Sequence, residues 1–133
     1  LHCSASGKLF MSQMRSSKRR ALLENLDLRR FTGNTITSLD LLESELDRTR
    51  KSEIGIDNQE YLDGLICVAV PIMDVNGQIA AALAVQAPIA RLTLANALEH
   101  VVHLKAAAAA MSETFSGSSC SAAAALETQP RRA

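Results

Sequence analysis

The feature that most constrains the fold is a pair of apolar segments joined by an Asn-Gly dipeptide. The segments cover residues 64–73 and 78–88, and the dipeptide is Asn76-Gly77. Asn-Gly tolerates positive φ at both central positions of a type I′ turn, so the pattern predicts a β-hairpin with strands near 65–73 and 78–86. Polar interruptions are few, and a largely apolar sheet with few inward polar groups suits a small-molecule pocket better than a nucleic-acid surface.

The bulk composition fits one domain with an aliphatic core. The chain has 133 residues, of which 47% are hydrophobic and only 3% aromatic. Fourteen basic residues balance fourteen acidic ones, which argues against a dominant nucleic-acid surface. No apolar run is long enough to span a bilayer, and residues 1–10 carry no signal-peptide pattern. Three widely spaced cysteines form no disulfide framework, so we expect a cytoplasmic protein without a membrane partner.

The spacing of apolar residues predicts helices on both sides of the hairpin. The predicted order is a helix over 4–14, a helix over 17–26, a helix after Thr37, a strand over 54–57, the hairpin, and a helix from Thr93 onward. Thr37 with Asp40 resembles a capping box, and Thr93 is a favourable N-cap. Residues 114–133 lack a strong period and predict a disordered tail. This order predicts an α+β domain with an antiparallel sheet.

Few side chains are candidates for chemistry. Cys67 stands at the start of a buried strand, but a nucleophile needs a base, and buried cysteine is usually a small apolar residue, so a pocket-lining role is favoured. Asp57 could accept a hydrogen bond from a ligand hydroxyl or cap the turn that follows it. His100 and His103 lie three residues apart beside Glu99 but lack further ligands, so we expect no metal site and no cofactor.

The segment 4–8 reads Ser-Ala-Ser-Gly-Lys and lacks the glycine spacing of a phosphate loop. Free N–H groups at a helix N-terminus attract anions, so these residues and the Ser6 hydroxyl could hold a carboxylate. An ordinary serine-capped helix explains the same residues equally well.

Four short motifs, in order and spacing, resemble those of a known family. They are LHCSASGK at 1–8, similar to L-H-A-(S/T)-A-x-G-K; TGNTIT at 32–37, similar to T-x-N-T-I-T; residues 57–71, similar to D-(D/N)-x-E-(F/Y)-x-x-G-(L/V)-x-C-(I/V)-A-(A/V)-P; and RLT at 91–93, similar to R-(L/M/I)-(S/T). Together they resemble the C-terminal effector-binding domain of the isocitrate lyase regulator (IclR) family of bacterial transcription regulators. The resemblance covers residues 1–113.

The resemblance implies a fold related to GAF and PAS domains, with an antiparallel sheet flanked by helices and here without its first helix and strands. It implies that the chain is not an enzyme and is the ligand-sensing portion of a transcription regulator. Such a portion binds a small organic or aromatic acid, forms homodimers or tetramers through effector domains, and modulates DNA binding by an N-terminal winged helix-turn-helix. Carried over position by position, the pocket residues are Ala5, Ser6, Asp57, Cys67, Ala84 and Gln86.

Two departures from the family pattern bear on the ligand and the fold. Family members that bind small keto acids have serines at the positions of Ala84 and Gln86, which disfavours glyoxylate or pyruvate here. Glu53 stands where a helix-ending glycine is usual.

Two alternative functions stay open: a free-standing GAF-like sensor or oligomerisation module with no DNA-binding role, and a thiol enzyme that uses Cys67. A sheet without its first strands would have an exposed edge.

Overall fold

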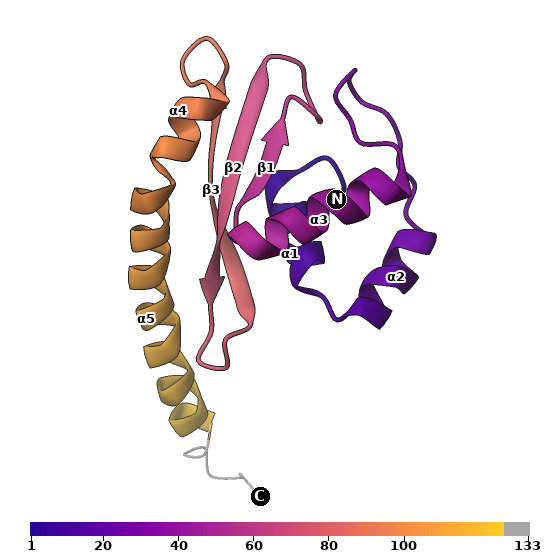
Figure 1. The fold of residues 1–133 in the computed structure, drawn as a ribbon. Helices are drawn as coiled ribbons and strands as arrows, with labels where there is room; N and C mark the ends of the chain where they lie inside the picture. Colours follow the sequence, from indigo (N-terminus) through magenta and orange to yellow (C-terminus); the bar gives the residue numbers. More distant parts are fainter. Residues whose placement is uncertain (127–133) are drawn as a thin grey trace, which may run out of the picture.

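A computed structural model describes residues 1–126 of the chain, with side chains described for residues 1–113. The elements are α1 (Ala5–Gln13), α2 (Ser16–Glu24), α3 (Leu39–Ser52), β1 (Gly55–Asn58), β2 (Leu65–Met73), β3 (Ile79–Pro88), α4 (Leu94–Glu99) and α5 (Val101–Leu126). Helices α4 and α5 cover one face of the sheet, and α1, α2 and α3 lie on the other side (Figure 1). The predicted α+β class with an antiparallel sheet is therefore confirmed.

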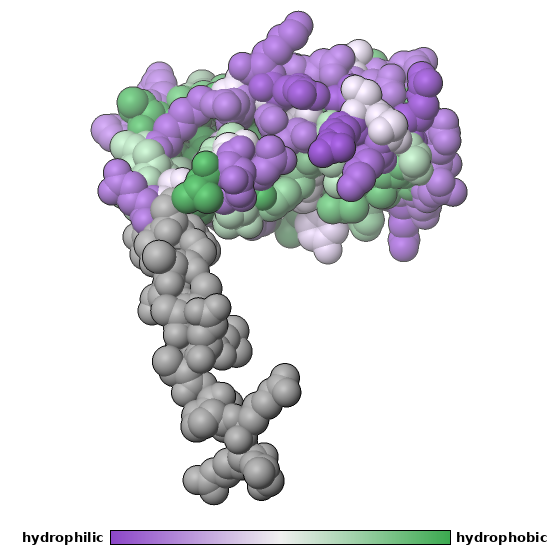
Figure 2. Space-filling view, turned by 90° about the horizontal axis from the view of Figure 1, so that it is seen from below, coloured by the Kyte–Doolittle hydropathy of each residue, from purple (hydrophilic) through white to green (hydrophobic). Residues whose placement is uncertain are grey.

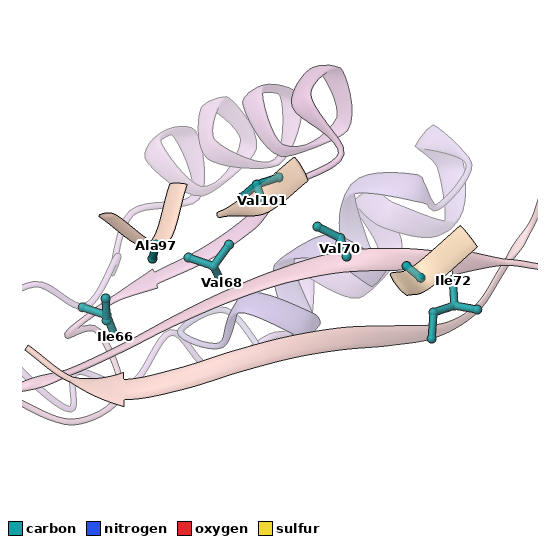
Figure 3. Close-up of a cluster of buried hydrophobic side chains, with 7 residues drawn as sticks. Ile66, Val68, Val70, Ile72, Ala97 and Val101 are labelled. Carbon is teal, nitrogen blue, oxygen red and sulfur yellow. The ribbon is translucent and has the colours of Figure 1, made fainter. Parts of the chain in front are cut away.

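The sheet has three antiparallel strands in the order β1-β2-β3. Alternation along β2 sends every second side chain to the face covered by α4 and α5. The buried residues of that face and of the two helices form the main core, which Figure 3 shows. They are Ile66, Val68, Val70 and Ile72 of β2, Ala97 of α4, and Val101 and Ala108 of α5. The intervening residues of β2 face α1, so a single strand contributes to both sides of the sheet.

Helix α1 packs closely against the other face of the sheet. Ala5 and Leu9 of α1 are buried against Ala69 of β2. A Cβ added at Gly55 would lie 2.1 Å from the carbonyl oxygen of Ala5, so this close approach requires glycine in β1. A separate apolar cluster joins α1 to α2 and α3, and its buried members are Met11, Leu23, Leu42 and Leu46.

The hairpin is present, but the predicted type I′ turn is wrong. Gly77 has a φ of 70°, whereas Asn76 does not have a positive φ. Asp74 pairs with Gln78 across a three-residue loop that ends in the left-handed glycine. The physical reason is the Asp74 carboxylate, which accepts hydrogen bonds from the N–H groups of Asn76 (2.8 Å) and Gln78 (2.9 Å).

Two predicted helix starts have different outcomes. The proposed capping box is wrong: Ser38 is the N-cap of α3, and Thr37 instead accepts a hydrogen bond from Arg30 Nη2 at 3.2 Å. Thr93 is confirmed as an N-cap, because its hydroxyl accepts the N–H of Asn96 at 3.2 Å.

The structure also defines where the later helices begin and end. The last predicted helix is divided at His100 into α4 and α5. Glu53, at the C-cap of α3, adopts a left-handed conformation with φ of 56°, the conformation that favours glycine. The predicted disordered tail falls partly on α5, which continues to Leu126, and partly on residues 127–133, which lie outside the described residues.

The surface is mixed in character. Figure 2 shows a face dominated by hydrophilic side chains with smaller hydrophobic patches between them. Within residues 1–126, no helix combines the length and apolar character needed to cross a bilayer.

Candidate ligand-binding site

A cavity of about 280 Å³ lies where the N-terminus of α1 meets the sheet. Its lining residues are Ser4, Ala5, Ser6, Asp57, Tyr61, Cys67, Ala84 and Gln86. The structure therefore brings all six predicted site residues to one cavity. Ser4 and Tyr61 are additional. Tyr61 is exposed and its ring lies 5.2 Å, centroid to centroid, from that of Phe31.

The strand register explains how residues far apart in sequence meet. Asp57 of β1 lies opposite Cys67 of β2, which in turn lies opposite Gln86 of β3. Residues opposite one another in a sheet share a face, so these three form a row across the sheet. Ala84 lies two residues before Gln86 and therefore on the same face. Both Ala84 and Gln86 are exposed, because β3 is the edge strand on that side.

The N-terminus of α1 forms a second wall of the cavity. Ser4 is the N-cap, and its hydroxyl accepts the N–H of Gly7 at 3.1 Å. The N–H groups of Ala5 and Ser6 stand in the first helical turn and have no acceptor within the helix. The serine cap is thus observed. Anion binding by the remaining N–H groups stays a prediction.

Asp57 is buried and performs the turn-capping role that was one of its two predicted readings. Its Oδ1 accepts the N–H of Glu60 at 2.8 Å. Burial raises the pKa of Asp57 above the ordinary aspartate value, and hydrogen bonds from the N–H groups of Glu60 and Tyr61 partly offset that rise. The cavity lining contains no Lys, Arg or His side chain, and Asp57 is its one carboxyl side chain.

Cys67 is half-buried in the centre of the row. Burial, and then the charge of Asp57, raise the pKa of its thiol. A thiol with a raised pKa is a poor nucleophile at neutral pH, because the thiolate is the reactive form. The geometry therefore fits the pocket-lining role predicted for Cys67 and not the thiol-enzyme alternative.

Sequence reasoning missed a buried ion pair behind the cavity. Lys8 of α1 is fully buried, and its Nζ lies 2.5 Å from Glu60 Oε1 and 3.3 Å from Glu45 Oε1. Burial raises the pKa of Glu60, against the lowering effect of Lys8. Burial would also raise the pKa of Glu45, but hydrogen bonds from Arg48 and the charge of Lys8 outweigh it, so this pKa is lowered. The available signal was the position of Lys8, three residues after buried Ala5 on the same helix face.

Two larger cavities lie against α5. One, of about 430 Å³, is lined partly by Met73 and Lys105. The other, of about 320 Å³, is mainly apolar and includes His100 and His103. Among the described residues, no group of three or more His, Cys, Asp or Glu side chains could hold a metal ion.

Comparison with known proteins decides the family. The model of the family described as "Bacterial transcriptional regulator IclR C-terminal" matches residues 1–113. The chain belongs to the IclR family. A curated IclR-type relative, "Probable transcriptional regulator SauR" of Cupriavidus necator, is 44% identical over 115 residues, which are 86% of this chain and 46% of the relative. The "HTH-type transcriptional regulator KdgR" of Escherichia coli is 34% identical over 108 residues, which are 81% of this chain and 41% of the relative.

Solved structures of IclR-type domains share the fold. The C-terminal domain of E. coli KdgR is 32% identical, with a TM-score of 0.78 over 86% of this chain and 70% of that one. The inducer-binding domain of PobR from Acinetobacter, solved as a double mutant in complex with 3-hydroxybenzoic acid, is 26% identical. Its TM-score is 0.77 over 83% of this chain and 63% of that one.

These comparisons separate what is established from what is proposed. The family and its curated relatives are transcription regulators, not enzymes, which removes the thiol-enzyme alternative. The chain spans less than half the length of the curated relatives described above. The role of the site in a whole regulator is therefore a proposal.

Proposed function

We propose that residues 1–113 form the ligand-sensing domain of an IclR-type transcription regulator. In this proposal the cavity at the N-terminus of α1 binds a small organic or aromatic acid. Its occupancy changes DNA binding by a winged helix-turn-helix outside this chain. The proposal includes a cytoplasmic location and a homodimer or tetramer formed through effector domains.

The observation that carries this proposal is the convergence of three separate segments on one cavity. The N-terminus of α1 supplies N–H groups and the Ser6 hydroxyl. The end of β1 supplies Asp57, and the paired strands supply Cys67 and Gln86. A small cavity with a few convergent polar groups on an apolar sheet is the usual form of a small-molecule site.

The distribution of charge restricts the ligand. Backbone N–H groups at a helix N-terminus favour a carboxylate, whereas Asp57 favours a hydrogen-bond donor such as a hydroxyl. Gln86 can both donate and accept. We infer that the ligand carries a carboxylate at one end and a hydroxyl at the other, on a body larger than pyruvate. The PobR domain, whose structure contains 3-hydroxybenzoic acid, supports this choice of chemistry.

The test is a thermal-shift screen of the chain against organic and aromatic acids, with 3-hydroxybenzoate and its neutral analogue 3-hydroxybenzyl alcohol as a matched pair. At 100 times its Kd, a ligand stabilises the folded state by about 2.7 kcal/mol, which is readily measured as a rise in Tm. We expect at least one acid to raise Tm while its neutral analogue does not. Stabilisation by neutral compounds alone would contradict the proposal.

Substitutions then assign the acid to this cavity. Loss of one hydrogen bond to a charged group costs about 1.5–3 kcal/mol, so Ser6→Ala and Gln86→Ala should each weaken binding about ten-fold or more. Calorimetry with the acid found in the screen measures both. Unchanged affinity in both variants would place the ligand elsewhere.

A further inference from the structure

Lys8 is a fully buried cation that does not line the cavity. Its Nζ contacts the carboxylates of Glu60 and Glu45, at 2.5 and 3.3 Å. Removing both ions of a buried pair in favour of apolar residues is often neutral for stability, because desolvation offsets their attraction. Glu60 Oε2 is buried and has no hydrogen-bond partner among the described residues, so the pair is not fully satisfied. Stability alone does not account for this arrangement.

The ion pair joins two walls of the cavity. Lys8 lies one helical turn after Ser4, in the helix whose first residues form one wall. Glu60 lies in the loop after β1, and its N–H donates to Asp57 Oδ1 at 2.8 Å. A short chain of contacts therefore runs from α1 through Lys8 and Glu60 to the carboxylate of Asp57.

The other contacts of this loop fix it to a different part of the molecule. Gln59 has a φ of 59°, a strained conformation for a residue other than glycine. The hydroxyls of Thr32 and Thr35 donate to the carbonyls of Gln59 (2.7 Å) and Glu60 (2.5 Å). These bonds hold the loop against the segment before α3. The Lys8 contact is the side-chain ion pair that ties it to α1.

We propose that Lys8 and Glu60 are positioning residues for the ligand site. Their ion pair sets the distance between the N-terminus of α1 and Asp57, and with it the access to Cys67 between them. Both residues act through Ser6 and Asp57 and do not touch the ligand. The inference rests on the proposed ligand site, but its first test needs no ligand.

The test measures how fast iodoacetamide alkylates Cys67 in the 133-residue chain, resolved from the other cysteines by peptide mass spectrometry. The main variant is the double substitution Lys8→Met with Glu60→Met, which replaces both ions by apolar side chains of similar length. Glu45, the other partner of Lys8, keeps its hydrogen bonds from Arg48 (2.9 and 2.6 Å), so we expect this variant to fold with a Tm near that of the parent chain. Because the cavity walls are no longer held together, Cys67 should react about three-fold faster or more.

A matched control removes a different ion pair. Asp47→Ala removes the carboxylate that pairs with Arg19, in a contact that joins α2 to α3 and does not involve the cavity. Its alkylation rate should equal that of the parent chain. A purely structural role for Lys8 and Glu60 would alter Tm without a specific change at Cys67.

Two results would overturn the proposal: an unchanged Cys67 rate in a folded double variant, or a double variant that does not fold. The second would make the pair a requirement of the fold. Failure of the proposed function has a separate signature, because it appears as an absence of acid binding and leaves the alkylation rates as predicted here.

Discussion

Replacing Gly55 by alanine should destabilise the protein and disturb the cavity in one step. The new Cβ would lie 2.1 Å from the carbonyl oxygen of Ala5, 2.9 Å from its carbonyl carbon and 3.2 Å from Leu9 Cβ. Two of these neighbours are backbone atoms of α1, which no rotamer change can move. The helix must therefore shift away from β1 by about 1 Å to restore van der Waals contact.

The cost of this shift follows from the packing of α1. Ala5 and Leu9 are buried against the sheet, so displacement of α1 strains a close-packed contact. Overpacking of this kind costs about 1–3 kcal/mol. With a urea m-value of about 1–3 kcal/mol/M, the denaturation midpoint should fall by about 1 M.

Gly33→Ala is the matched control for this prediction. A Cβ at Gly33 meets nothing within 4 Å, and its φ is not positive. Urea denaturation followed by circular dichroism should give Gly33→Ala a midpoint close to that of the parent chain. A Gly55→Ala midpoint equal to that of Gly33→Ala would refute the close packing of α1 on β1.

Three further predictions have defined outcomes. Glu53→Gly should increase stability by about 1 kcal/mol and so raise Tm, because glycine relieves the left-handed strain and the substitution loses an exposed 3.8 Å contact with Lys105. A lower Tm would contradict this. The stability of Asp57→Asn relative to the parent should increase as pH rises. The pKa of Asp57 is raised in the folded state, so its protonated carboxyl stabilises the parent at low pH, and this stabilisation is lost as pH rises through the folded-state pKa. Tm measured against pH checks this, and a constant difference would refute it. The chain alone, with a formal net charge of zero, should show no sequence-selective DNA binding in a mobility-shift assay at moderate salt.

Local patterns predicted most of the elements but few of the contacts. The hairpin followed from two apolar runs around a turn dipeptide, since these signals are local. The turn type did not, because the Asp74 carboxylate overrides the preference of Asn-Gly by bonding to two N–H groups. The capping box failed for a similar reason, since Thr37 bonds to Arg30 instead.

The site depended on information that no local pattern contains. Asp57, Cys67 and Gln86 lie in one row only because of the register of three strands, and register is fixed by the packing of the whole sheet. The family resemblance carried that grouping, whereas residue chemistry alone left Asp57 and Cys67 with alternative roles. Neither residue chemistry nor the family resemblance predicted the ion pairs of Lys8, because its partners Glu45 and Glu60 come from distant segments.

The alternation along β2 has a consequence for how such a domain can change. Ile66, Val68, Val70 and Ile72 belong to the core beneath α4 and α5, while Cys67 between them faces the cavity. Adjacent positions of one strand therefore have different roles: alternate residues pack in the core, and Cys67 between them lines the ligand cavity. The lining positions on β2 and β3 can be exchanged without touching the residues that hold α4 and α5 in place, whereas Cys67 also packs against the cluster that holds α1. New ligand preferences are thus open to this fold by few substitutions, while its architecture stays the same.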